Sequence, residues 1–141
     1  MRLAVPAILL TLLAAGCGTF DGDVEIEIDS GFSNEDRFAI ATAAAKWNTV
    51  TRRKIIVASR GDVLVISADN PTGYAGWESS RWDLVRIDPD APREHVYSIA
   101  LHEFGHMLGI RHTRSGVMHP SERHWELSEE DLAACRRAWA C

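Results

Sequence analysis

Residues 102–112 read His-Glu-Phe-Gly-His-Met-Leu-Gly-Ile-Arg-His, and this stretch decides how the rest of the chain is interpreted. On a helix, side chains four positions apart project from the same face, so His102 and His106 can each direct a ring nitrogen to one metal ion. Imidazole ligands in a tetrahedral arrangement favour zinc. Glu103 comes round beside the open coordination position, where it can accept a proton from water. The stretch therefore predicts a zinc-binding helix with a base beside the metal.

A third ligand is predicted just past the end of this helix. A further helical turn would carry a side chain past the ion, so the third ligand must lie beyond a bend. Gly109 tolerates the left-handed conformation that ends a helix, which lets His112 swing back toward the metal. Three neutral imidazoles and one water make a catalytic site, because a structural zinc site fills its fourth position with protein. The alternative is a surface helix whose histidines are solvated and bind nothing.

The same residues resemble the elongated zinc motif of the metzincin metalloproteases, His-Glu-x-x-His-x-x-Gly-x-x-His followed by a methionine-containing turn. Residues 115–120, Ser-Gly-Val-Met-His-Pro, match that turn in place and content. The chain is most similar to the matrixins, which have a glycine at the position of Gly105 and Met-x-Pro in the turn. Residues 43–48 resemble the first helix of such domains, and residues 127–132 resemble the start of their closing helix.

The resemblance implies an α+β fold, with residues 23–141 forming a metzincin-like zincin domain. Its parts are a twisted mixed sheet, an active-site helix, a Met-turn in which Met118 forms an apolar floor beneath the zinc, and a C-terminal helix. It also implies a zinc-dependent endopeptidase acting on protein or peptide substrates, with one catalytic zinc ion and Glu103 as general base. The alternatives are a non-catalytic, zinc-holding, envelope-anchored binding module and a purely structural lipoprotein.

Departures from the matrixin pattern limit what the resemblance implies. The chain has no Pro-Arg-Cys-Gly-x-Pro-Asp segment, so the cysteine-switch latency of animal matrixins has no counterpart. The loop between Ile66 and Ile87 is short, and His95 is the only histidine between the leader and the motif, so we expect no second, structural zinc. Calcium binding stays open. Residues 120–122, Pro-Ser-Glu, replace the Pro-x-Tyr wall of the specificity pocket, so no cleavage preference is implied.

Patterns outside the motif predict one α+β unit. Alternating and β-branched runs predict strands, and stretches with an apolar side that follow capping residues predict helices. We expect strands at 24–28, 54–58, 62–66 and 82–88. A further edge strand is expected near Tyr74–Trp77, where it would pair with substrate. Helices are expected at 37–50 after the N-cap Ser33, at 94–109, and from Ser128 onward. The apolar side of the first helix is predicted to carry Phe38, Ala41, Ala45 and Trp47. His95 is interpreted as a surface or capping residue, and Arg111 as a surface charge, with a substrate anchor as the alternative. His119 and His124 are interpreted as exposed loop histidines, with auxiliary transition-state donors lining the cleft as the alternative.

The N-terminus is predicted to be an export signal. Arg2 is followed by thirteen uncharged residues, which is the length of a signal-peptide core and too short for a spanning helix. Small residues then precede Cys17, which resembles the lipobox of bacterial lipoproteins. Residues 1–16 are therefore predicted to be a lipoprotein-type signal peptide, and residues 17–22 a lipidated cysteine with a short tether. The alternative is an ordinary secretory signal with Cys17 incidental, which makes the protein secreted rather than anchored in the cell envelope.

Composition limits the partners and the redox chemistry. A chain of 141 residues with a formal charge of −5 fits one globular domain and argues against a nucleic-acid binder. We expect a monomer that contacts the membrane only through its lipid anchor. In an exported protein Cys135 and Cys141 can pair, provided that the last helix ends before Cys141. On a continuous helix a spacing of six would put them on different faces, so both states stay open.

Overall fold

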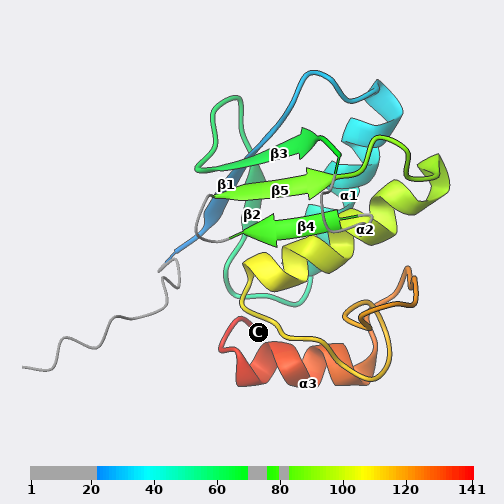
Figure 1. Ribbon diagram of the computed structural model, residues 1–141. Helices are drawn as coiled ribbons and strands as arrows, with labels where there is room; N and C mark the ends of the chain where they lie inside the picture. The colour runs from blue at the N-terminus through cyan, green and yellow to red at the C-terminus, as the bar shows by residue number, and fades with distance from the viewer. Residues whose placement is uncertain (1–21, 70–75, 80–82) are drawn as a thin grey trace, which may run out of the picture.

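The computed structural model describes residues 22–69, 76–79 and 83–141, and Cys17 lies outside this part of the chain. A sheet and two long helices form its main layers, with a third helix below them (Figure 1). In chain order the elements are β1 (Val24–Ile28), α1 (Asn34–Asn48), β2 (Ile55–Val57), β3 (Val63–Ser67), β4 (Gly76–Ser79), β5 (Leu84–Ile87), α2 (Arg93–Met107) and α3 (Glu129–Arg137). The fold is α+β, as the sequence predicted.

The sheet has five strands in the order β2-β1-β3-β5-β4. The first four run parallel, and β4 pairs antiparallel with β5 at the edge, so the sheet is mixed. Strand β1 shows the predicted alternation of buried and solvent-facing side chains. Val24, Ile26 and Ile28 are buried, while Glu25 is exposed. The predicted edge strand is present as β4, although it begins at Gly76; Tyr74 lies outside the described residues.

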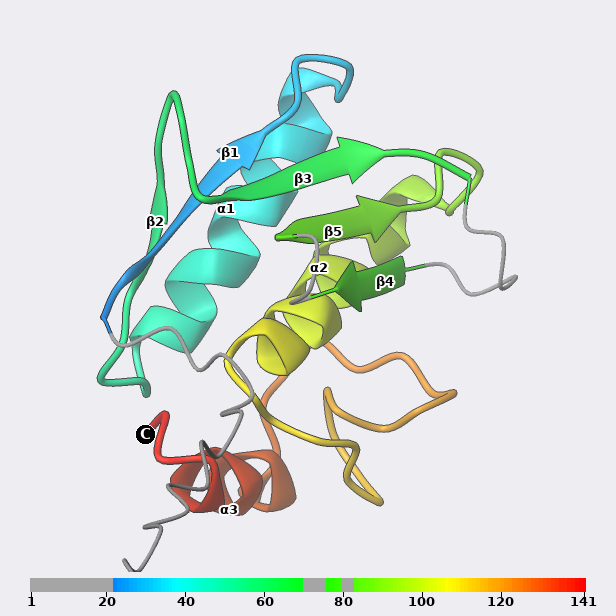
Figure 2. The same ribbon diagram turned by 60° about the vertical axis from the view of Figure 1, so that its left-hand side comes forward.

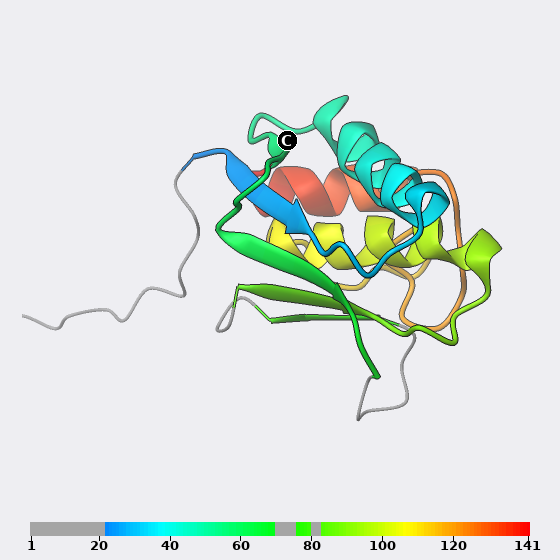
Figure 3. The same ribbon diagram turned by 90° about the horizontal axis from the view of Figure 1, so that it is seen from above.

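Helices α1 and α2 lie side by side on one face of the sheet (Figure 3). Ser33 caps α1 by accepting a hydrogen bond from the amide of Asp36, as expected. The predicted apolar side was partly wrong, because Phe38 is 75% exposed and Ala45 is also exposed. The buried stripe instead follows the i, i+3, i+4, i+7 spacing of one helix face and consists of Ile40, Ala43, Ala44 and Trp47.

The core lies between this helical layer and the sheet, and the described buried apolar side chains run from Val24 to Ala140. Trp47 on α1 is completely buried, and its indole nitrogen donates a hydrogen bond of 2.7 Å to the carbonyl of Leu101 on α2. This bond holds the two helices together at the level where α2 carries its histidines. In the described part of the chain, no helix combines the length and the apolar character that crossing a bilayer requires.

The last helix, α3, has a capping box at its start and a tight reversal at its end. Ser128 and Asp131 exchange side-chain-to-backbone hydrogen bonds. The helix ends at Arg137, and the chain then turns so that a disulfide joins Cys135 to Cys141, with their Cα atoms 5.3 Å apart. The helix thus stops before Cys141, which is the condition that pairing required.

Candidate metal centre

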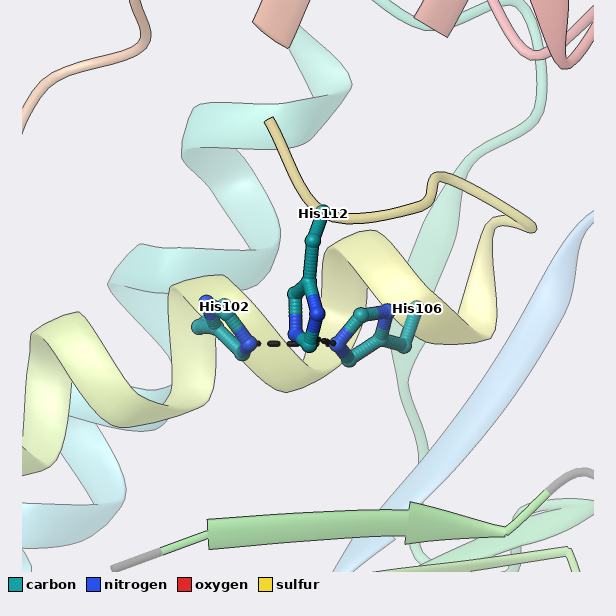
Figure 4. Close-up of side chains that lie close together, drawn as sticks. All are labelled: His102, His106 and His112. Carbon is teal, nitrogen blue, oxygen red and sulfur yellow. Dashed lines mark hydrogen bonds between the residues drawn. The ribbon is translucent and has the colours of Figure 1, made fainter. Parts of the chain in front are cut away.

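Two of the predicted ligands lie on α2, one turn apart. His102 is 7% exposed and His106 is half-buried, and both rings project from the same side of the helix (Figure 4). This placement follows from the helical repeat, which brings positions i and i+4 to one face. The two histidines therefore present their rings to one point beside the helix.

The third histidine is brought back by the predicted glycine bend. Gly109 has φ +82°, a left-handed conformation that only glycine adopts without strain. The amide of Gly109 donates to the carbonyl of His106 at 2.8 Å, and that of Ile110 donates to Gly105 at 2.9 Å. These two bonds form a Schellman ending. The reversed chain then places His112 over the other two rings (Figure 4).

The three ring nitrogens converge at the spacing of ligands around one ion. The Nε2 atom of His106 lies 3.1 Å from Nε2 of His102 and 3.1 Å from Nε2 of His112. Zinc–nitrogen bonds of about 2.05 Å at a tetrahedral angle would place two ligand nitrogens about 3.3 Å apart. Among the described residues, the cluster able to hold a metal consists of these three histidines, without a cysteine or a fourth histidine. The donor set fits a zinc ion with one position left for water or substrate.

Backbone carbonyls fix which nitrogen of each buried ring faces the centre. The Nδ1 atom of His102 lies 2.7 Å from the carbonyl oxygen of Val117, and that of His106 lies 2.9 Å from the carbonyl of Ile110. A carbonyl can only accept, so Nδ1 of each ring carries the proton and donates it. Each Nε2 therefore turns a lone pair toward the centre. Lone pairs this close repel one another unless a cation lies between them.

Burial also keeps these rings neutral, which is the form that binds metal. Removal from water lowers the pKa of His102 to about 4, against the opposing effect of its hydrogen bond to Val117. Burial likewise lowers the pKa of His106, and the nearby ring of His112 lowers it further. Both imidazoles are thus available as ligands at neutral pH.

The Met-turn packs directly beneath α2. Met118 is completely buried, and a β-carbon at position 105 would lie 2.2 Å from its sulfur atom. Gly105 is therefore needed for the turn to approach the helix this closely. The same turn supplies the Val117 carbonyl that orients His102, so packing at Met118 and orientation of the first ligand depend on one segment.

Asp131 on α3 is the functional residue that sequence reasoning missed. Its buried carboxylate accepts hydrogen bonds from the amides of Val117 and Met118, at 2.8 and 3.0 Å, and from the hydroxyl of Thr113 at 2.9 Å. It also accepts from the amide of Ser128 in the capping box. The capping pattern was visible in the sequence, but the second set of partners arises only when α3 packs on the Met-turn. Asp131 therefore holds the segment that orients His102.

We expect Asp131→Asn to lower the free energy of unfolding by about 2–4 kcal/mol, because an amide nitrogen would then face backbone donors. Urea unfolding measures this change. Glu129→Gln, an exposed change in the same helical turn, should stay within about 0.5 kcal/mol of the wild type. Equal urea midpoints of unfolding for Asp131→Asn and the wild type would show that the Asp131 carboxylate does not stabilise the Met-turn.

Glu103 lies on the side of α2 that faces the edge strand. Its side chain is buried, and a β-carbon at Gly76 would lie 2.6 Å from its Oε1 atom. The absence of a side chain at position 76 thus lets β4 approach the carboxylate. Both residues line a cleft of about 490 Å³ that also contains the three histidines and two arginines, Arg111 and Arg123. The cleft therefore brings together the Glu103 carboxylate, the histidine cluster and the edge strand.

The remaining histidines lie outside the lining of this cleft. The Nδ1 atom of His119 accepts hydrogen bonds from the amides of Ser121 and Glu122, so its ring is turned into its own loop. His124 lies 3.3 Å from the carboxylate of Glu122, and the ring of His95 packs near Trp125. These positions agree with the surface interpretation. Arg111 is exposed as well, in agreement with the same interpretation, and it also lines the cleft. Arg123, which sequence reasoning did not single out, lines the cleft too.

Comparison with known proteins agrees with this geometry. No curated protein matches the chain. A family model described as matrixin matches residues 19–140, which includes every described element from β1 to α3. Matrixins are zinc metallopeptidases, and the histidine cluster found here could hold their metal. Because the match covers most of its length, the chain belongs to the matrixin family.

Proposed function

We propose that this protein is a zinc-dependent endopeptidase in which Glu103 is the general base. The observation that carries the proposal is the convergence of three Nε2 atoms, two of them fixed by carbonyls so that their lone pairs face one point. Such a centre with three protein ligands is typical of catalytic zinc rather than structural zinc. The acidic residue that hydrolysis needs is the immediate neighbour of His102 and lines the same cleft.

The chemistry divides between the metal and the chain. Zinc, when bound, lowers the pKa of water and polarises the carbonyl of the peptide bond. Glu103 accepts the proton of the attacking water through a carboxylate oxygen and then gives it to the leaving amine nitrogen. His102, His106 and His112 would hold the metal, and the carbonyls of Val117 and Ile110 keep the rings of His102 and His106 in the ligating tautomer.

An extended substrate would lie along β4, the edge strand of the described sheet that lies beside the cleft. A peptide that adds to a sheet edge makes main-chain hydrogen bonds with little demand on its sequence. Gly76 places this edge next to Glu103, so a scissile bond held there would lie within reach of the base. Substrates are therefore expected to be unfolded or loop segments of proteins.

Removal of the metal tests this proposal directly. We expect the purified protein to cleave casein, to lose that activity after dialysis against a zinc chelator, and to regain it when zinc is added back in a one-to-one ratio. Elemental analysis should find one zinc ion per chain before chelation. Undiminished cleavage by metal-free protein would contradict the proposal, whereas zinc binding without any cleavage would favour the non-catalytic binding module.

The charge of the cleft predicts which substrates are cleaved fastest. Arg111 and Arg123 line it, and Arg123 is close enough to influence His102 electrostatically. We expect peptides with Glu or Asp near the scissile bond to be cleaved on the order of tenfold faster than matched Lys peptides at low salt, and the ratio to shrink as salt rises. Arg123→Gln should reduce the ratio, and Arg60→Gln, on an exposed loop after β2, should leave it unchanged. A ratio independent of Arg123 would contradict this assignment.

We further propose that the chain is exported and held at the cell envelope by lipid on Cys17. The support is the uncharged run after Arg2 and the small residues before Cys17. Cys17→Ser should move the protein from the membrane fraction to the soluble fraction of the cells that export it. Equal membrane association in this variant would favour the ordinary secretory signal.

A further inference from the structure

Both ends of the described chain meet at one end of the molecule, beside the segment that leads into β2 (Figure 2). The amide of Arg52 donates to the carbonyl of Ala140 at 2.8 Å, and Nε of Arg53 donates to the carbonyl of Gly22 at 2.8 Å. The start of β1 is fixed there as well, because the amide of Val24 donates to Lys54 at 2.7 Å. The position at which the N-terminal tether leaves the domain is therefore next to the C-terminus.

Trp139 projects from this end in a strained conformation. It is 86% exposed, more than any other large apolar side chain of the described residues, and its φ of +60° is left-handed. Its amide donates to Arg136 and the following amide donates to Cys135, so Trp139 occupies the helix-ending position where glycine is preferred. The disulfide to Cys141 closes the turn around it. Backbone strain held in this way is often associated with function.

Basic side chains surround this tryptophan. Arg52 and Arg136 line a hollow of about 580 Å³ together with Trp139 and the apolar side chains of Val50 and Leu132. Both arginines are exposed, and neither forms an ion pair with another described residue. The chain as a whole carries a formal charge of −5, so two exposed arginines lining one hollow stand out from an acidic chain. An exposed aromatic ring between arginines is complementary to a surface that is apolar beneath and anionic on top.

We propose that the terminal patch, defined as Arg52, Arg136 and Trp139, docks onto an anionic phospholipid bilayer. Tryptophan would insert at the headgroup level, and the guanidinium groups would pair with lipid phosphates. The position of the tether supports this occupant, because the five Cα-to-Cα steps from Cys17 to Gly22 span at most about 18 Å. Acyl chains on Cys17 would bring the terminal patch to the bilayer. The inference goes beyond peptidase activity. It depends on the predicted lipid anchor only for the argument that a short tether holds the terminal patch near the bilayer.

Vesicle binding of the unlipidated mature chain tests the proposal. Residues 17–141 carrying Cys17→Ser are sedimented with vesicles of phosphatidylcholine alone, or with one-third phosphatidylglycerol. We expect binding to the anionic vesicles only, weakened about 25-fold in Arg52→Ser/Arg136→Ser, since each basic residue near such a surface contributes about fivefold. Trp139→Gly should weaken binding by about tenfold or more. It should also abolish the tryptophan quenching caused by brominated lipid.

Matched variants separate docking from a general loss of structure. Phe38→Ala removes another exposed aromatic ring, and Arg60→Ser removes an exposed charge elsewhere; both should bind as the wild type does. Trp139→Gly should unfold no earlier than the wild type, since glycine suits its backbone conformation. Glu103→Gln should bind vesicles normally, so a failure of the proposed peptidase activity would not imitate a failure of docking.

Three results would overturn the proposal. Unchanged vesicle binding in both Arg52→Ser/Arg136→Ser and Trp139→Gly would show that the terminal patch does not contact the bilayer. Equal binding to neutral vesicles would remove the role of charge. Binding to a soluble polyanion such as heparin, without vesicle binding or quenching by brominated lipid, would assign the surface to a polyanionic partner instead.

Discussion

Glu103→Gln should lower kcat/KM for peptide cleavage by about a thousandfold or more while leaving one zinc ion bound. Glutamine has the size and shape of glutamate but cannot accept the proton of water, so the variant removes the base without opening the cleft. Proton transfer by a positioned side chain contributes typically about 10²–10⁴-fold, and the expected loss lies in the upper part of this range. The upper part is appropriate because Glu103 is 5% exposed, which limits access of solvent bases that could replace it.

The measurement is cleavage of a fluorogenic peptide, combined with elemental analysis of the same preparations. Glu94→Gln is the matched control, because Glu94 lies on the same helix but is exposed near its start. It should retain full activity. If Glu103→Gln cleaved as fast as the wild type, Glu103 would not be the base, and water activation would have to come from another group.

His112→Ala should abolish activity and weaken zinc retention by more than about a hundredfold. Changes in the groups that merely orient ligands typically cost 10–100-fold in metal affinity, and removal of a ligand should cost more. His112 lies outside α2 and is exposed, and it reaches the other two histidines only through the bend at Gly109. The two helix histidines would remain in place but could supply only two of the four positions of zinc.

Competition with a chromophoric chelator measures this loss. His119→Ala provides the control, because the His119 ring is turned into its own loop and lies outside the cleft lining. It should retain zinc as the wild type does. Full zinc occupancy in His112→Ala under the same competition would refute the assignment of the third ligand.

The histidine cluster was predictable because its geometry is local. The spacing of His102 and His106 follows from one helical turn, and Gly109 encodes the reversal that returns His112. All three ligands therefore lie within eleven consecutive residues, and no long-range packing had to be known. The positions of Ser33 and Ser128 at helix starts were predictable for the same reason, since capping depends on neighbours three residues away.

Features that depend on packing between distant segments were not predictable. The alternation in β1 indicated a strand but not that its neighbours are β2 and β3. Likewise, Phe38 had the apolar character of a core residue, but the orientation of α1 on the sheet leaves it exposed. Asp131 and Arg123 acquire their roles only when the last third of the chain folds over α2. For such residues the sequence shows whether the side chain is charged, polar or apolar, but not which residues it contacts.

The carboxylate of Asp131 also determines when a newly made chain becomes complete. The amides of Val117 and Met118 find their acceptor only after residue 131 has been synthesised and α3 has docked. Until then the carbonyl that orients His102 belongs to an unsupported loop, so a growing polypeptide lacks a finished histidine cluster. The histidine cluster is thereby completed only at the last stage of biosynthesis.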